Sequence, residues 1–145
     1  MTTKKVLIAE DHPLIVKGLK QIIYSLSPEI EAIDVDNCED FMTMSNQIKS
    51  MSCIVDLNLA DGMSFSCIEN ILNLYPETNI MIYTAFPGVM YAKRLFKLGV
   101  NGFLNKSAGE AELQFAIKKF LEEEFYVSPE FLPLMFAKGK QFQNY

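Results

Sequence analysis

The sequence predicts an α/β fold: a three-layer α/β/α sandwich in which helices cover both faces of a mainly parallel, five-stranded sheet. Short apolar runs alternate along the chain with longer segments of helical periodicity. Most of these runs are too continuous for strands that expose one face to solvent, which favours a sheet buried on both sides. The chain has 145 residues, half of them hydrophobic, which suits one domain with one packed core.

Five apolar runs are the predicted strands. They are residues 6–9, 32–35, 53–55, 80–83 and 102–104. Parallel neighbours need a crossover between them, so each strand is expected to lead into a helix with right-handed connections.

The segments after the strands place apolar side chains on one helical face, with spacings such as i, i+3, i+7 and i+10. The predicted helices cover residues 15–26, 41–51, 65–75, 89–98 and 113–121. Pro13 suits a first helical turn, Pro87 and Gly88 break the chain after the fourth strand, and Gly99 ends the fourth helix. A short extra helix is expected from Ser128 to about residue 139.

Composition excludes several classes of protein. The net charge is −5, and the 13 basic residues are scattered, so this chain itself is not expected to bind nucleic acid. Three cysteines without a C-x-x-C pair predict neither a disulfide framework nor a cysteine zinc site, and fit a reducing cytoplasm. No apolar run approaches the roughly 20 residues of a membrane span, so no membrane partner is expected.

Polar residues follow the strands at the edge of the sheet where open α/β folds bind their ligands. In chain order they are Glu10, Asp11, Asp56, Asn58, Thr84 and Lys106. Three converging carboxylates would repel one another unless a cation lay among them, and Mg²⁺ prefers such oxygen ligands. A lysine beside them suits a phosphate oxygen, and a carboxylate next to Mg²⁺ can attack phosphorus. The edge therefore predicts Mg²⁺-dependent phosphoryl chemistry.

The pieces LIAEDHPLIVKGL, IVDLNLAD, IMIYTA and GVNGFLNKSAGEAEL follow one another in this order. Together they resemble the receiver domain of two-component response regulators, over about residues 5–127. The resemblance implies a flavodoxin-like, CheY-like sheet with strand order 2-1-3-4-5. It also implies that residues 1–127 are the receiver, and we interpret residues 128–145 as a linker or a short extra helix.

The resemblance assigns roles to the acidic residues. Asp56 matches the phosphoacceptor. Glu10 and Asp11 match the pair that holds Mg²⁺, with Asp11 as the more direct ligand. Asn58 matches the position whose backbone carbonyl contacts the metal.

The remaining roles belong to the switch that the resemblance implies. Thr84 matches a hydroxyl that moves toward the phosphoryl group, and Lys106 matches the lysine that pairs with it. Phe103 matches an aromatic side chain that swings inward as the threonine moves. Ala60 and Ser64 depart from the proline and glycine of many relatives. His12 and Asp61 are interpreted as ordinary loop residues.

The stretches EDHPLIVKGL and GFLNKSAGE to FYVSPE are similar to a subgroup with a LuxR/NarL-type helix-turn-helix after the receiver. Nothing in this chain corresponds to that domain. The implied function is a cytoplasmic switch, not a metabolic enzyme, which catalyses only its own phosphorylation and dephosphorylation. A sensor histidine kinase or phosphotransfer protein is the implied donor. Homodimerisation, and DNA binding through a helix-turn-helix outside this chain, are further expectations.

Four alternatives are open at this point: a stand-alone receiver in a phosphorelay, a Mg²⁺-dependent phosphatase with an Asp nucleophile, an interaction module without phosphorylation, and a flavodoxin. Whether the gene continues past Tyr145 into a helix-turn-helix would decide between a transcription factor and the stand-alone receiver. Turnover of phosphate esters would favour the second, and partner binding unchanged by Asp56→Asn the third. The acidic loop after the first strand has the wrong charge for a flavin phosphate.

Overall fold

The computed structural model describes residues 4–49, 51–85 and 89–133. Its main sheet consists of β1 (Lys5–Ala9), β2 (Glu31–Val35), β3 (Ser52–Val55), β6 (Asn79–Thr84), β7 (Gly102–Asn105) and β8 (Tyr126–Val127). The order is β2-β1-β3-β6-β7-β8, and every neighbouring pair is parallel. The strands β4 (Asn58–Leu59) and β5 (Gly62–Met63) form a separate antiparallel hairpin.

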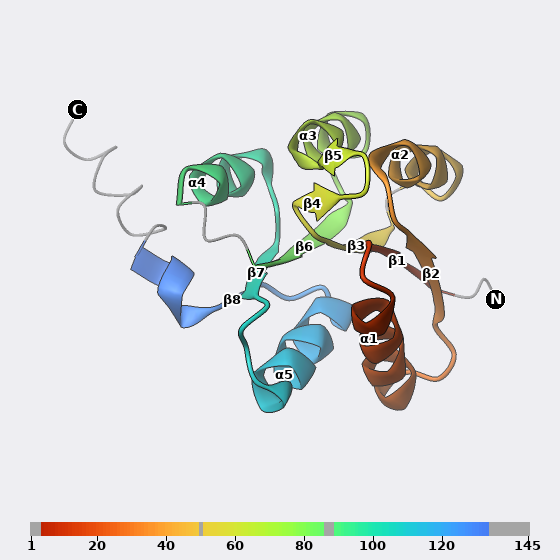
Figure 1. Cartoon of the computed structure of the whole chain (residues 1–145), viewed down its shortest axis with the longest axis vertical. Helices are drawn as coiled ribbons and strands as arrows, with labels where there is room; N and C mark the ends of the chain where they lie inside the picture. The colour runs from red at the N-terminus through yellow and green to blue at the C-terminus, as the bar shows by residue number, and fades with distance from the viewer. Residues whose placement is uncertain (1–3, 50, 86–88, 134–145) are drawn as a thin grey trace.

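Helices cover both faces of the sheet (Figure 1). One face carries α1 (Pro13–Leu26) and α5 (Glu110–Leu121). The other carries α2 (Cys38–Gln47), α3 (Phe65–Leu74) and α4 (Val89–Leu98). The three-layer α/β architecture predicted from the sequence is confirmed.

The core is divided by the sheet into two apolar layers. Successive residues of a strand point to opposite faces, so Leu7 packs with the α2–α4 layer and Ile8 with the α1/α5 layer. Both side chains are fully buried, and burial of each such side chain contributes about 1.5–3 kcal/mol. Burial on both faces explains why these strands read as continuous apolar runs.

The structure differs from the prediction in the number of strands and in the end of the second helix. The five expected strands occur in the order 2-1-3-4-5, but β8 adds a sixth strand beside β7. It has two residues, which is too short to produce a periodic pattern. The second helix ends at Gln47 rather than near residue 51, and Met51 directly precedes β3, where its carbonyl accepts the N–H of Asn79 at 3.1 Å.

The segment after α5 packs against the sheet. It includes a 3-10 helix, η1 (Pro129–Phe131). The predicted end of the extra helix, near residue 139, lies outside the described residues, as do Pro87 and Gly88. Across the residues that the structure describes, no helix is both long and apolar enough to cross a membrane.

Candidate functional site

Glu10 is a carboxylate buried in the loop between β1 and α1, with only 3% of its surface exposed. Its Oε2 accepts hydrogen bonds from the N–H groups of Asp11 and His12, at 3.0 and 3.2 Å. The same oxygen lies 2.7 Å from Nδ1 of the His12 ring. Backbone donors that precede the first turn of α1 are thus paired with a carboxylate, which also suits the positive end of that helix.

Asp56 follows β3 directly and is 5% exposed. Its backbone is held from both sides: its N–H donates to the carbonyl of Ala9 at 2.9 Å, and its carbonyl accepts the hydroxyl of Ser64 at 2.7 Å. Ser64, fully buried, therefore closes the loop that contains β4 and β5. The side chain is left to face the rim of the sheet, where Asn58 N–H lies 3.4 Å from Oδ1.

Lys106 joins the two buried carboxylates. It follows β7, and its Nζ lies 2.7 Å from Glu10 Oε1 and 2.9 Å from Asp56 Oδ2. Burial alone would lower the pKa of Lys106, but its bonds to Glu10 and then Asp56 outweigh burial and raise the pKa above its usual value. The ammonium is therefore charged at neutral pH and neutralises part of the acidic cluster.

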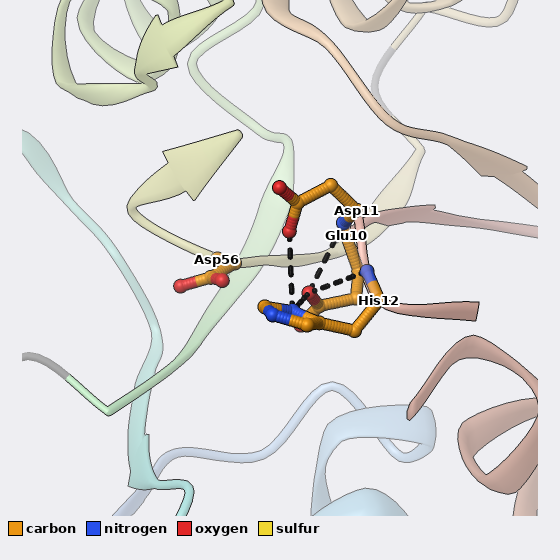
Figure 2. Close-up of side chains that lie close together, drawn as sticks. All are labelled: Glu10, Asp11, His12 and Asp56. Carbon is orange, nitrogen blue, oxygen red and sulfur yellow. Dashed lines mark hydrogen bonds and ion pairs between the residues drawn. The ribbon is translucent and has the colours of Figure 1, made fainter. Parts of the chain in front are cut away.

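An acidic cluster forms where β1 and β3 end. Ligand atoms of Glu10, Asp11, His12 and Asp56 all lie within 4.8 Å of one another. Figure 2 shows the carboxylates of Glu10 and Asp11 meeting at the His12 ring, with Asp56 beside them from the neighbouring strand. The cluster collects residues that are separated by more than forty positions in the chain.

The donor set of this cluster fits Mg²⁺. The buried oxygens Glu10 Oε1 and Asp11 Oδ1 accept no hydrogen bond within the described residues. Each has only a neighbour at ion-pair distance, Lys106 Nζ at 2.7 Å for the first and His12 Nδ1 at 3.1 Å for the second. Carboxylate oxygens with unused lone pairs are what a hard divalent cation requires.

The other predicted residues lie around this cluster in different ways. Thr84 ends β6, is 1% exposed, and its carbonyl accepts the N–H of Lys106 at 2.9 Å. Phe103, also 1% exposed, belongs to the core layer of α2–α4 and packs against Phe96 with ring centres 5.1 Å apart. Asn58 is exposed in β4, and its contact with the site is through its backbone. Glu10, Asp11, Asp56 and Lys106 are thus brought together, whereas Phe103 lies in the core.

Two residues near the site were given no functional role by the sequence reasoning. His12 was interpreted as a loop residue, yet its ring contacts both Glu10 and Asp11. Tyr83 lies beneath the ammonium of Lys106, 5.8 Å from ring centre to Nζ. Burial raises the pKa of Tyr83, the charge of Lys106 opposes the rise, and Glu10 adds to it. The position of His12 directly after Glu10 and Asp11 could have indicated that it lies at the site. Tyr83 has no such signal, because in the sequence it is one more apolar residue of a strand.

Asp61 caps α2 from the loop after β4. Its carboxylate accepts the N–H groups of Cys38 and Glu39 at 2.8 and 3.4 Å. Asn37, the N-cap residue, accepts the N–H of Asp40 at 2.7 Å. The first backbone N–H groups of α2 are therefore all paired, and the loop that follows Asp56 is tied to this helix.

The cap predicts a pH-dependent contribution to stability. The hydrogen bonds from Cys38 and then Glu39 hold the pKa of Asp61 below its ordinary 3.8, although slight burial opposes them. A depressed pKa means that the contribution is complete above pH 3.8 and is lost as pH falls through the folded-state pKa. Asp61→Asn is expected to lower the urea midpoint at pH 7, and the gap from the parent should close below pH 3.8.

The matched control is Glu29→Gln, which removes an exposed carboxylate from the loop before β2. Its midpoint should follow the parent at every pH. A gap for Asp61→Asn that stays constant from pH 7 into acid would contradict the charged cap.

Comparisons with known proteins agree on the family. The family model described as "Response regulator receiver domain" matches residues 6–118 of this chain. The chain is 23% identical to the glycerol metabolism activator of Pseudomonas putida over 97% of this chain and 64% of that protein. It is 29% identical to the oxygen regulatory protein NreC of Staphylococcus aureus over 85% of this chain and 57% of that protein. The chain thus spans less than two thirds of the length of these relatives.

Solved structures show the same fold. A two-component response regulator of the LuxR family from Aurantimonas sp. superimposes with a TM-score of 0.79 at 21% identity, covering 94% of this chain and 98% of that one. The isolated REC domain of RcsB from Salmonella enterica gives a TM-score of 0.76 at 16% identity, covering 92% and 99%. The family description covers most of the sequence, and the chain therefore belongs to the receiver domains of two-component response regulators.

Proposed function

We propose that this chain is a phosphorylation-dependent switch in which Asp56 accepts a phosphoryl group from the phosphohistidine of a sensor histidine kinase or phosphotransfer protein. The observation that carries the proposal is the pairing of the Asp56 carboxylate with Lys106 at the rim of the sheet, beside Glu10 and Asp11. A structural ion pair between Asp56 and Lys106 would need neither Asp11 nor a second buried carboxylate, Glu10, on the same ammonium.

The residues divide the chemistry among them. An oxygen of Asp56 bonds to phosphorus while the bond from phosphorus to the histidine nitrogen breaks; that nitrogen keeps the electron pair and takes a proton from water. Lys106 already contacts Asp56 and holds a positive charge where the new group, with about −2 charge, would lie. Thr84, at the end of the adjacent strand, is the proposed hydroxyl partner. The low exposure of Asp56 limits attack by water on the acyl phosphate.

Mg²⁺ is the proposed cofactor. Glu10, Asp11, Asp56 and the backbone carbonyl of Asn58 would hold it, and bound Mg²⁺ would neutralise charge on the phosphoryl oxygens.

The wider role rests on the relatives. Those named above include an activator and a regulatory protein, and a RcsB structure is described as two dimers bound to two parallel DNAs. We infer a cytoplasmic regulator of transcription whose DNA binding uses a domain outside this chain, with homodimerisation as part of its output. This chain catalyses only its own phosphorylation and dephosphorylation.

The test is a mass measurement. The chain is incubated with Mg²⁺ and acetyl phosphate, a small acyl-phosphate donor, and its intact mass is recorded. We expect the gain of one phosphoryl group, dependent on Mg²⁺ and released by hydroxylamine, as an acyl phosphate is.

Two variants assign the group. Asp56→Ala should abolish the gain completely, because the nucleophile is gone. Asp61→Asn, a change to another aspartate of the same loop, should preserve it. A phosphoryl gain that survives Asp56→Ala, or no gain in the parent, would refute the proposed function.

A further inference from the structure

The segment from Tyr126 to Phe131, which we call the tail strap, is packed onto the strand that leads into the site. Its first two residues form β8, in parallel register with Gly102 and Phe103 of β7. Lys106 follows the same strand. β7 therefore leads into the proposed phosphoacceptor site at its end, where Lys106 contacts Asp56, and pairs with the tail strap along one edge.

Ser128 fastens the tail strap to β7 with two hydrogen bonds. Its N–H donates to the carbonyl of Phe103 at 2.8 Å, and its hydroxyl oxygen accepts the N–H of Asn105 at 3.2 Å. The residue is completely buried. A buried hydroxyl with these partners is specific to the docked position, because undocking would leave two backbone groups of β7 unpaired.

Phe131 packs directly on Phe103. The ring centres are 5.0 Å apart, with the planes tilted by 53°, and Phe131 is only 4% exposed. Phe103 also packs against Phe96 of α4, with the two ring centres 5.1 Å apart. The seat of the tail strap is thus formed by Phe103, the aromatic side chain that the resemblance implies as the switch, in its inward position.

Gly102 makes room for the tail strap. A Cβ at this position would lie 3.0 Å from the carbonyl oxygen of Tyr126 and 3.1 Å from Cγ of Met81. α5 holds the start of the strap as well, since the Tyr126 hydroxyl donates to Glu112 at 2.6 Å. Strand pairing, a buried serine, an aromatic stack and a required glycine all fit one docked position.

We propose that the tail strap is a latch that docks more tightly when Asp56 is phosphorylated, so that it passes the state of the site to the residues that follow it. The inference rests on the proposed function. Added charge on Asp56 strengthens its pairing with Lys106, which in turn holds the end of β7 in the arrangement that keeps Phe103 inward. Coupling of this kind is reciprocal: a docked latch also favours the phosphorylated site.

The first experiment is hydrogen exchange on the full chain with Mg²⁺, with and without acetyl phosphate, alongside the intact mass. We expect the amides of Ser128 and Phe131 to exchange about tenfold more slowly in the phosphorylated chain, within the range usual for coupled sites. A chain that gains the phosphoryl group but exchanges these amides at an unchanged or faster rate overturns the latch and leaves the proposed function standing. A chain that gains none overturns both.

The second experiment measures the reverse effect. Beryllium fluoride, a phosphoryl mimic, is titrated into the chain with Mg²⁺ by calorimetry. Phe131→Ala is expected to weaken its binding about tenfold. The matched control, Leu132→Ala, changes the exposed neighbour and should bind as the parent does. Equal affinities in Phe131→Ala and the parent would refute the coupling. Should Phe131→Ala fail to fold, Phe131→Leu and the exchange measurement on the parent decide the question.

Discussion

Replacing Lys106 with methionine is expected to lower the free energy of unfolding by roughly 3–5 kcal/mol, the usual cost of removing one partner from a buried ion pair. The side chains of Glu10 and Asp56 are only 2% and 5% exposed, and Lys106 Nζ lies within 2.9 Å of both. Without the ammonium, two buried carboxylates face each other with no positive charge between them. Methionine keeps most of the apolar part of the lysine side chain, so the loss of stability can be attributed to removal of the positive charge.

The measurement is urea unfolding at pH 7, with and without Mg²⁺. Saturating Mg²⁺ should restore part of the loss, because a cation that binds only the folded chain stabilises it. The matched control is Lys20→Met, which breaks a surface ion pair with the half-exposed Asp34 and should cost no more than about 1 kcal/mol. Equal losses in the two variants would show that the buried cluster is not charged as described.

Replacing Phe103 with alanine is expected to cost roughly 3–5 kcal/mol, as for other large-to-small changes in a protein core. The ring is 1% exposed and packs between Phe96 and Phe131. Its removal leaves a cavity beneath the tail strap that the helices on either side cannot fill without moving. The same change removes the seat of Phe131, so exchange at Ser128 should accelerate.

Thermal and urea unfolding of Phe103→Ala are compared with those of Phe115→Ala. Phe115 is 49% exposed on α5, and its loss should cost much less. A loss for Phe103→Ala as small as that for Phe115→Ala would mean that Phe103 does not occupy the core position described here.

Much of the fold could be predicted because burial on both faces leaves a direct mark on the sequence. Leu7 and Ile8 serve opposite core layers, so β1 reads as an unbroken apolar run. The convergence of Glu10, Asp56 and Lys106 could also be predicted, since parallel strands end at one edge of the sheet. Their roles in phosphoryl transfer stay predictions.

The parts that were missed depend on contacts distant in sequence that have no periodic pattern. The contact of Asp61 with Cys38 spans two elements, and an aspartate before Gly62 reads as an ordinary turn. Ser64 was noted as a departure from glycine, but nothing local shows that its hydroxyl holds the carbonyl of Asp56. Phe131 directly follows Pro129 and Glu130, so its place in the core was not visible in the sequence.

The pairing of β8 with β7 also places a strand of only two residues at this edge of the sheet. An open edge strand offers unpaired N–H and carbonyl groups to any other chain. Tyr126 and Val127 cover two positions of β7 that would otherwise form such an edge next to the large apolar ring of Phe103. Because β8 is the outermost strand and has two residues, it offers a neighbouring molecule few backbone groups for strand addition.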